Sequence, residues 1–510
     1  MTAPYPADTI PTLLDRATAE APAIGAPGRP WLTHGGLRAL RAGTVAALNG
    51  MGIGRGDRVA IVLPNGSEMA AAFVAIAGGA TTAPLNPAYR ADEFDFYLAD
   101  LNARALVIQE GMDSPARTVA AARGVPIVEL RPGEAAGSFT LHPPAGLAGT
   151  PARAGGAAAD DVALVLHTSG TTSRPKIVPL RHINVTASAV HIARTLALTP
   201  DDCCLNIMPL FHIHGLMAAT LASLGAGAAV CATPGFNAFR FFTWFAEARP
   251  TWVTAVPTMH QALLPYAERN REVIARGRLR LLRSSSASLP PQVMAALEAA
   301  FGVPVIESYG MTEASHQMAS NPLPPAARHP GSVGVAAGPE IAIMDDAGRL
   351  LPTGERGEVV IRGRNVTAGY EANPEANARA FTNGWFRTGD EGWLDEAGYL
   401  RLSGRLKEII NRGGEKVSPL EVDAVLMDHP AVQQVVTFAM PHDKLGEEVA
   451  AAVVLRPGAT LDETGLRGFA AERLAAFKVP RRIVFLDEIP KGATGKLQRI
   501  GLAARLGLGG

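Results

Sequence analysis

The sequence predicts an α/β protein with a large N-terminal domain of stacked, mostly parallel sheets, a small β subdomain, and a small mobile α+β C-terminal domain. Short apolar runs alternate with helical patterns over most of the chain, which is typical of parallel sheets covered by helices. Between residues 331 and 402 the pattern changes to short strands separated by Gly, Asn and Asp turns. The chain has 510 residues, and single cores stop growing at roughly 250–300 residues, so at least two domains are expected.

The predicted N-terminal domain begins with an amphipathic helix over 8–21. The stretch 58–66 predicts a buried strand that ends in a Pro-Asn-Gly turn, and 68–87 predicts a helix closed by glycines and followed by a strand. Further apolar strands are expected within 103–111, 125–130 and 163–170. The last of these opens directly into a loop rich in hydroxyl groups.

The same alternation continues in later stretches, each of which is a strand-like run that leads into a loop: 202–215, 225–235, 250–264, 279–289 and 302–313. In several of them, polar residues gather just past the end of the apolar run. In open α/β sheets, ligands bind at the edge formed by the carboxyl ends of the strands. The functional site is therefore expected at that edge.

The pattern changes again near the boundary that we place between a domain of residues 1–404 and a domain of residues 405–510. The two glycines at 413–414 predict a hairpin turn, and the Ser-Pro pair at 418–419 predicts the start of a helix. Two apolar strands and a second helical pattern follow. The second domain is therefore a compact α+β module.

Composition excludes several classes of function. Lys and Arg number 47, as do Asp and Glu, so no basic excess exists for binding nucleic acid or an anionic membrane. No apolar run is long enough to span a bilayer, and the N-terminus lacks the basic and apolar segments of a secretory signal. Three cysteines without C-x-x-C spacing cannot form a disulfide framework. We therefore expect a cytoplasmic protein whose partners are small molecules.

The stretch LHTSGTTSRPKIVPL, residues 166–180, has the composition of a phosphate-binding loop. Hydroxyl side chains and backbone N–H groups wrap phosphate oxygens, and a lysine adds a point charge. The stretch differs from the G-x-x-x-x-G-K-[ST] loop of nucleotide hydrolases. The residues expected to hold phosphate are Thr168, Ser169, Gly170, Thr171, Thr172, Ser173 and Lys176.

Six motifs in a fixed order give the chain a resemblance to a known family. The loop 168–176 is followed by FHIHG at 211–215, YGMTE at 309–313, GWFRTGD at 384–390, GRLKEIINRGGEKVSP at 404–419 and PKGATGK at 490–496. In these motifs the sequence resembles the adenylate-forming superfamily of acyl-CoA synthetases, luciferases and peptide-synthetase adenylation domains, over nearly the whole chain. The resemblance implies that a carboxylic acid is activated as an acyl-adenylate, with ATP, Mg²⁺ and coenzyme A.

The resemblance also implies roles for residues of the nucleotide site. Thr312 and Glu313 would contact the α-phosphate and Mg²⁺, because a hard carboxylate oxygen suits that ion. This Thr-Glu pair is also expected to begin a helix, whose N-terminus favours anions. Tyr309 would pack on adenine, and the base would be lined by Ser288, Glu307 and Ser308.

The resemblance implies roles for five further residues. They concern the ribose, the acyl phosphate and the later step in which coenzyme A displaces AMP. Asp390 matches the family aspartate that accepts hydrogen bonds from both ribose hydroxyls, with Arg405 beside it. Lys496 would neutralise the acyl phosphate during adenylation. Lys407 falls at the family hinge, about which the small domain is expected to rotate after the first step. That rotation would bring Gly414 beside the pantetheine, where a glycine allows close approach of the backbone.

Within the superfamily, the sequence resembles the oxalate–CoA ligase branch. Stretches such as MTEASHQMASNPLP and EIINRGGEKVSPLEVDAVL carry this resemblance, and Ser173 stands where most of the superfamily has glycine. Oxalate is a small dianion that needs cationic or hydrogen-bonding groups, whereas a fatty acid needs an apolar pocket. His212 would be the gate of the acyl pocket, and the second carboxylate would be bound by His214, Arg283, Ser286 and His316. In the alternative interpretation, Arg283 forms a salt bridge at a strand end. The three histidines are then core or gate residues whose hydrogen bonds are made within the protein.

Other functions stay open at this point. A short-chain or malonate-type acyl-CoA synthetase is the nearest, and an adenylation domain that loads a carrier protein is more distant. Domains that select amino acids usually place an Asp near the FHIHG region, and this chain has none there. A catalytically idle homologue is suggested only by Ile177, which replaces the glycine that usually follows the lysine. Either this position never needs the freedom of glycine, or the β-branched residue reduces loop mobility and activity.

Overall fold

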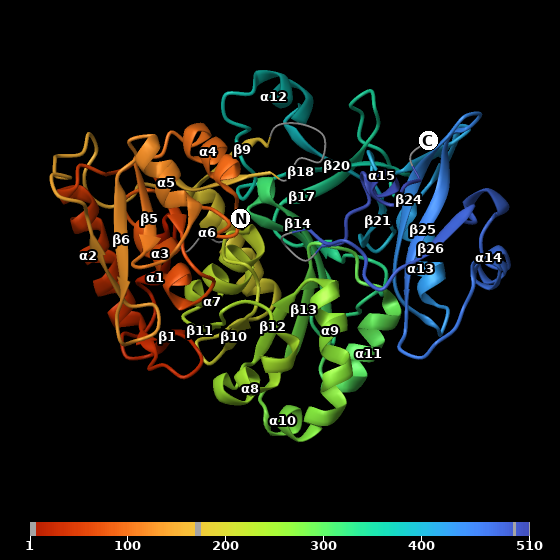
Figure 1. The fold of residues 1–510 in the computed structure, drawn as a ribbon, viewed down its shortest axis with the longest axis horizontal. Helices are drawn as coiled ribbons and strands as arrows, with labels where there is room; N and C mark the ends of the chain where they lie inside the picture. Colours follow the sequence, from red (N-terminus) through yellow and green to blue (C-terminus); the bar gives the residue numbers. More distant parts are fainter. Residues whose placement is uncertain (1–6, 169–174, 493–495, 509–510) are drawn as a thin grey trace.

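The computed structural model describes residues 7–168, 175–492 and 496–508, and it confirms the predicted α/β class. Over those residues the chain forms four β-sheets. Two large sheets make up the first part of the chain, a smaller sheet adjoins them, and the fourth belongs to a separate C-terminal lobe, drawn in blue in Figure 1.

The first large sheet has seven strands, of which only the edge strands β7 and β9 run antiparallel to their neighbours. Its central strands are continuous apolar runs because helices cover both faces. In spatial order the strands are β7 (Phe139–His142), β6 (Ile127–Pro132), β5 (Ala105–Gln109), β3 (Arg58–Val62), β4 (Thr81–Pro84), β8 (Val162–His167) and β9 (Ile177–Arg181).

The second large sheet has nine strands, and its interior strands β11, β10, β12, β13 and β14 are parallel. Their carboxyl ends therefore meet at one edge, where the sequence predicts a site. In spatial order the strands are β16 (Val335–Ala336), β15 (His316–Ser320), β14 (Val305–Met311), β13 (Leu281–Ser285), β12 (Trp252–Ala255), β10 (Cys203–Asn206), β11 (Ala229–Ala232), β1 (Pro22–Gly25) and β2 (Leu32–Thr33).

Helices are packed between the two large sheets. Helices α3 (Ser67–Ile76) and α6 (His182–Thr195) each contact strands of both sheets, and the π-helix η1 (His214–Leu221) packs beside them. All three segments are buried on nearly every face: α3 and η1 are almost entirely apolar, as expected of such helices, whereas α6 also buries several polar side chains. The outer faces of the sheets are covered by α4 (Ala91–Asp100), α5 (Pro115–Ala122), α8 (Ala238–Ala248), α9 (Pro257–Ala267) and α11 (Pro291–Phe301).

The predicted β subdomain is a five-stranded sheet. Its strands are β17 (Glu340–Met344), β18 (Gly357–Arg362), β20 (Trp385–Leu394), β19 (Phe381–Thr382) and β21 (Leu400–Arg405). The other helical segments of the N-terminal part are α1 (Ile10–Leu14), α2 (His34–Gly50), α7 (Ala222–Gly225), η2 (Glu268–Asn270), α10 (Arg271–Arg276), η3 (Thr312–Ala314) and α12 (Pro374–Ala380).

The C-terminal lobe combines a five-stranded sheet with short helices. The two glycines predicted to form a hairpin turn join β22 to β23, and both have positive φ angles. The predicted Ser-Pro helix start is α13, whose first turn is capped by the Ser418 hydroxyl. The elements are β22 (Ile410–Arg412), β23 (Glu415–Val417), α13 (Pro419–Met427), β24 (Val432–His442), β25 (Gly446–Leu455), α14 (Glu463–Ala471), η4 (Ala476–Lys478), β26 (Arg482–Phe485) and α15 (Leu502–Arg505).

The predicted first helix was too long. The helix α1 ends at Leu14, residues 15–21 form neither helix nor strand, and strand β1 begins at Pro22 and pairs with β11 from Ile24. The chain leaves the helix to reach its place in the sheet, so tertiary context overrides the helical pattern of residues 15–21. Among the helices of the described ranges, none has both the length and the apolar character needed to cross a bilayer.

The buried His182 is expected to make the fold sensitive to acid. His182 is 1% exposed, and its Nδ1 accepts the backbone N–H of Ile10 at 3.2 Å, which ties α1 to α6. Burial lowers the pKa of His182 to about 4 from 6.5. Because protonation is easier in the unfolded chain, the stability from this neutral histidine is present above pH 6.5 and is lost as the pH falls toward 4.

We therefore predict that the free energy of unfolding falls between pH 7 and pH 5, with up to roughly 3 kcal/mol from His182 by pH 4. His182→Gln should remove part of this pH dependence, whereas the same substitution at the half-exposed His142 should leave it intact. Urea unfolding at a series of pH values measures the effect. An identical pH dependence in wild type and His182→Gln would contradict the assignment.

Candidate active site

The hydroxyl-rich loop connects two antiparallel neighbours in the first sheet. His167 of β8 pairs with Ile177 of β9, and the backbone N–H of Thr168 donates to the Lys176 carbonyl at 3.0 Å. The Thr168 hydroxyl in turn accepts the Lys176 N–H at 3.2 Å. These contacts hold the two ends of the loop together. The other residues predicted to hold phosphate lie outside the described residues: Ser169, Gly170, Thr171, Thr172 and Ser173.

Ile177 lies in the extended strand β9, so its position does not require a positive φ angle. It is 7% exposed and belongs to the apolar core on the outer face of the first sheet. Its carbonyl accepts the N–H of Glu371 at 3.1 Å. The first of the two sequence interpretations is therefore correct: this position does not need the freedom of glycine.

Thr312 and Glu313 do not begin a long helix, which corrects the sequence expectation. They form the single 3-10 turn η3 between β14 and β15, because Ser315 takes a left-handed conformation with φ of 49° and ends the turn. A helix dipole is therefore not available at this position. The side chain of Glu313 is buried, and its Oε1 accepts the hydroxyl hydrogen of Tyr370 at 2.8 Å.

The donor set around Glu313 fits a magnesium ion that is carried by a nucleotide. Among the described residues, no cluster of three or more His, Cys, Asp or Glu side chains could hold a metal ion by itself. Mg²⁺ usually takes one or two protein carboxylates and completes its coordination with phosphate oxygens and water. Lys176 lies nearby, with Nζ 4.0 Å from the centre of the Tyr370 ring. Burial lowers the pKa of Lys176, while Glu313 opposes that shift.

A second group of predicted residues lies around Tyr309, near the carboxyl end of β14. The Tyr309 hydroxyl donates to Oδ2 of Asp390, and the guanidinium of Arg405 lies 3.5 Å from Oδ1 of the same carboxylate. The structure therefore brings together the three residues predicted for the base and ribose. Burial raises the pKa of Asp390, and Arg405 opposes the shift.

The residues predicted to line the base are adjacent to this group. Glu307 is 2% exposed, and its Oε1 accepts the N–H of Leu289 at 2.9 Å, one residue after the exposed Ser288. Burial raises the pKa of Glu307 to about 8. The carbonyl of Ser308 accepts the Ser285 hydroxyl at 2.9 Å, so β13 and β14 are joined beneath these side chains.

The four residues predicted for the acid lie together at the ends of β13 and β15 and at the start of η1. His214 contacts the Ser286 hydroxyl through Nδ1 at 3.1 Å and the Thr254 hydroxyl through Nε2 at 2.6 Å. The His316 ring lies 4.8 Å from the His214 ring, and neither of its nitrogens has a hydrogen-bond partner among the described residues. Ser286 and His316 both have positive φ angles, of 75° and 97°. Such strained backbone is held in place by its surroundings and is common at functional sites.

Arg283 is a fully buried cation without a carboxylate partner among the described residues. Its guanidinium donates to the Thr254 hydroxyl and to Oε1 of Gln317, both at 3.3 Å, while its Nε has no partner within the described ranges. Burial lowers the pKa of Arg283 to about 9, so the group is still charged at neutral pH. The alternative interpretation of Arg283 as a salt bridge at a strand end is therefore wrong.

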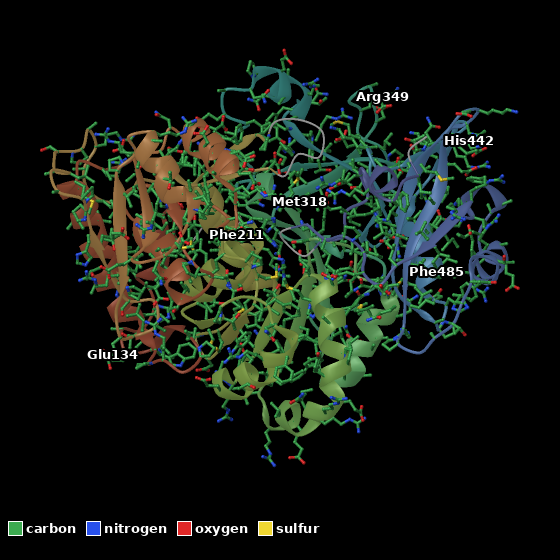
Figure 2. All side chains as sticks on the ribbon, viewed as in Figure 1. Glu134, Phe211, Met318, Arg349, His442 and Phe485 are labelled. Atoms are coloured by element: carbon green, nitrogen blue, oxygen red, sulfur yellow. The ribbon has the colours of Figure 1, made fainter. Side chains whose placement is uncertain are left out.

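Lys496 and His212 complete the site. The Lys496 ammonium is close enough to influence the pKa values of Asp390, His212 and His316, although it belongs to the C-terminal lobe. Burial lowers the pKa of Lys496 to about 8 and that of His212 to about 3. Figure 2 labels Phe211, which precedes His212, and Met318, which lies on the same strand as His316. Both are near the centre of the molecule.

Gly414 lies in the hairpin turn between β22 and β23. Its φ angle is 97°, and a Cβ atom added at this position would meet open space. The turn therefore leaves its backbone accessible. The Gly414 N–H donates to Oδ1 of Asn411 at 3.1 Å, within the same turn.

Sequence reasoning missed three residues of the site: Thr254, Gln317 and Tyr370. Thr254 and Gln317 hold Arg283, and they follow the rule that polar residues at strand ends mark the ligand edge. Tyr370 lies between Lys176 and Glu313, on the segment that follows β18. The stretch RNVTAGY that ends at Tyr370 contributes to the branch resemblance, but it gave this residue no role, because nothing in the sequence shows that the segment folds back onto β9.

Comparison with known proteins places this site in a family. The AMP-binding enzyme family matches residues 15–371, and the AMP-binding enzyme C-terminal domain matches residues 421–496. The chain is 45% identical to an oxalate–CoA ligase of Arabidopsis thaliana, over 96% of this chain and 97% of that protein. It is 42% identical to an oxalate–CoA ligase of Saccharomyces cerevisiae over 87% and 86%, and 35% identical to a sulfoacetate–CoA ligase of Cupriavidus necator over 92% of each.

Solved structures support the same fold. ATP-bound MatB from Rhodopseudomonas palustris superposes with a TM-score of 0.87 at 30% identity, over 98% of both chains. The apo form of the same protein gives a TM-score of 0.77 at the same identity and coverage. The arrangement of this chain is therefore more similar to that of the ATP-bound protein.

Proposed function

The chain belongs to the AMP-binding enzyme family, and from this membership we propose that it converts oxalate, ATP and coenzyme A to oxalyl-CoA, AMP and diphosphate. The observation that carries the choice of acid is Arg283, a buried cation without a carboxylate partner in the described chain. A buried charge is costly unless it is paired, so an anion is expected beside it. The second carboxylate of oxalate would be that anion, and two relatives named oxalate–CoA ligases favour this acid.

In the proposed first half-reaction, one carboxylate oxygen of oxalate attacks the α-phosphorus of ATP and diphosphate leaves. Lys176 and the hydroxyl-rich loop would bind the β- and γ-phosphates. Glu313 would hold Mg²⁺, which supplies charge neutralisation on the phosphates when bound. Lys496 would lie beside the charge that develops at the acyl phosphate, and Asp390 would fix the ribose.

In the proposed second half-reaction, the thiol of coenzyme A attacks the acyl carbon and AMP leaves. The domain of residues 405–510 would rotate about a hinge at Lys407 against the domain of residues 1–404, and Gly414 would then lie beside the pantetheine. The current position of Lys496 beside Asp390 supports the adenylating arrangement for this structure.

We also propose a cytoplasmic location. The three cysteines, Cys203, Cys204 and Cys231, are buried and free. Burial raises the pKa of Cys203 to about 12, so it is a protonated thiol and not a nucleophile. Unpaired buried thiols are typical of proteins that fold in a reducing compartment.

A second candidate function is the activation of another small dianionic acid. The relative named sulfoacetate–CoA ligase supports this candidate, because a sulfonate and a carboxylate both carry a negative charge that Arg283 could pair with. Malonate is one methylene longer than oxalate and presents the same second carboxylate. A carrier-protein-loading domain is less favoured, because the group formed by His214, Ser286 and Arg283 offers no carboxylate for an amino group.

A direct test compares acids under identical conditions. Purified enzyme would be assayed for coenzyme A-dependent AMP release with oxalate, malonate, sulfoacetate, acetate, a medium-chain fatty acid and a cinnamate. We expect the highest kcat/KM on oxalate, and a CoA thioester of oxalate by mass spectrometry. A higher kcat/KM on any of the other acids would end the assignment to oxalate, and a best rate on malonate or sulfoacetate would support the second candidate.

A further inference from the structure

Tyr370 joins two groups of opposite charge that belong to the proposed ATP site. Its hydroxyl donates to Oε1 of Glu313 at 2.8 Å, and the Nζ of Lys176 lies over its ring, 4.0 Å from the ring centre. The side chain is 8% exposed, so these contacts are made in a buried place. The same residue therefore contacts both the carboxylate and the ammonium.

The segment that carries Tyr370 is fastened to both neighbours by its backbone. The N–H of Thr367 donates to the Glu313 carbonyl at 2.7 Å, and the Thr367 hydroxyl donates to the Pro179 carbonyl at 2.9 Å. The N–H of Glu371 donates to the Ile177 carbonyl at 3.1 Å, and its carboxylate pairs with Arg58. Residues 367–371 thus connect η3 to the strand that follows the phosphate loop.

From these contacts we propose that Tyr370 is a positioning residue for magnesium-bound ATP. This inference rests on the proposed function, since it takes Glu313 as the carboxylate that holds Mg²⁺ and Lys176 as a phosphate ligand. A carboxylate has two oxygens, and the Tyr370 hydroxyl donates to Oε1 of Glu313; no hydrogen bond from the described residues reaches Oε2, which would be left for the ion. The face of the Tyr370 ring holds the Lys176 ammonium near that carboxylate, and the uncharged ring leaves the positive charge of the lysine available to phosphate.

A competing explanation is that Tyr370 only fills space. Its ring lies 6.3 Å from the ring of Phe386, so it does contribute to packing in the β subdomain. A purely structural residue would affect stability and both half-reactions together. A residue that orients Glu313 would instead affect the binding step that depends on Mg²⁺, and this difference allows a clear test.

The first variant is Tyr370→Phe, which removes the hydroxyl and keeps the ring. The affinity for a non-hydrolysable ATP analogue would be measured by calorimetry with excess Mg²⁺ and again with EDTA. We expect affinity with Mg²⁺ to fall by roughly 10- to 100-fold, the usual effect of losing an outer-shell partner of a metal ligand. Affinity in EDTA should stay at the wild-type value.

The second variant is Tyr370→Leu, which removes the ring as well. We expect a further loss of affinity for the analogue, and this loss should also appear in EDTA because Lys176 contacts phosphate without the metal. Tyr399→Phe is the matched control, since its hydroxyl donates to the Ala327 carbonyl at 2.6 Å and it stacks on His329. That variant should bind the analogue as the wild type does.

Three outcomes would overturn the proposal. The first is a Tyr370→Phe variant with wild-type affinity in Mg²⁺. The second is an equal loss of affinity in Mg²⁺ and in EDTA, and the third is an equal loss of adenylation and of thioester formation from supplied acyl-AMP. The binding assay contains no acid, so a wrong choice of oxalate leaves its result unaffected, whereas wild-type protein that fails to bind the analogue would refute the ATP site itself.

Discussion

Lys496→Ala should abolish acyl-adenylate formation and leave thioester formation from supplied acyl-adenylate close to the wild-type rate. The expected loss in the first half-reaction is at least about 100-fold, comparable to removal of one donor that stabilises a developing charge. The second half-reaction should survive because, in the proposed cycle, the C-terminal domain rotates and takes this lysine away before coenzyme A attacks. The measurement is ATP–diphosphate exchange for the first step and thioester release for the second.

The environment of Lys496 supports this expectation. Burial, together with the nearby Arg405, lowers its pKa to about 8, while Asp390 opposes the shift. The ammonium is thus mostly charged at neutral pH, and the Asp390 carboxylate near it is already engaged with Tyr309 and Arg405. ATP and the acid would supply that charge, so the side chain is prepared for an anionic substrate.

Lys491→Ala is the matched control, because this lysine belongs to the same terminal segment but pairs with Glu488 at 2.7 Å. It should retain both half-reactions. If Lys496→Ala lost both half-reactions equally, the residue would serve the fold of the lobe and not adenylation. If it retained diphosphate exchange, the role assigned to it would be wrong.

The sequence was sufficient to predict the fold class because the pattern of apolar residues along the chain reflects which faces of a strand or helix are buried. The apolar runs of β3 and β5 are continuous, as parallel strands covered on both faces must be. The α1 helix was predicted too long and η3 was predicted as a helix start, because both depend on tertiary contacts. The first ends at Leu14, before the chain reaches β1 and its pairing with β11, and the left-handed Ser315 ends the second.

The site residues that belong to recognisable motifs could be predicted from the sequence. Those that join the site through contacts between distant segments could not. His214, Arg283 and His316 were chosen for their chemistry, and the structure brings them together at one sheet edge. Tyr370 and Gln317 were missed because their roles depend on which side chains they reach in space. The absence of a carboxylate beside Arg283 in the described chain likewise cannot be read from sequence spacing.

Arg283→Met should raise the KM for oxalate by on the order of 100-fold or more, because removing one partner of a buried charge pair costs about 3–5 kcal/mol. The KM for ATP should change little, since the guanidinium donates to Thr254 and Gln317 and not to any residue of the proposed nucleotide site. Acetate lacks the second carboxylate, so its KM should not rise. Steady-state kinetics with oxalate, acetate and ATP as the varied substrates would separate these effects.

Arg283→Met should be at least as stable as the wild type, although it binds oxalate much more weakly. In the absence of substrate, the folded protein holds the Arg283 charge away from water with two hydrogen bonds of 3.3 Å and no carboxylate partner in the described chain. Methionine has a similar length and needs no desolvation of a charge, so Arg283→Met should unfold at the same temperature as wild type or a higher one. Arg283→Lys keeps a charge and should retain part of the oxalate affinity. A cation kept for an anionic substrate must cost stability when that substrate is absent, so its removal should not destabilise the free enzyme. A lower melting temperature together with a uniform rise in both KM values would instead show that Arg283 supports the core.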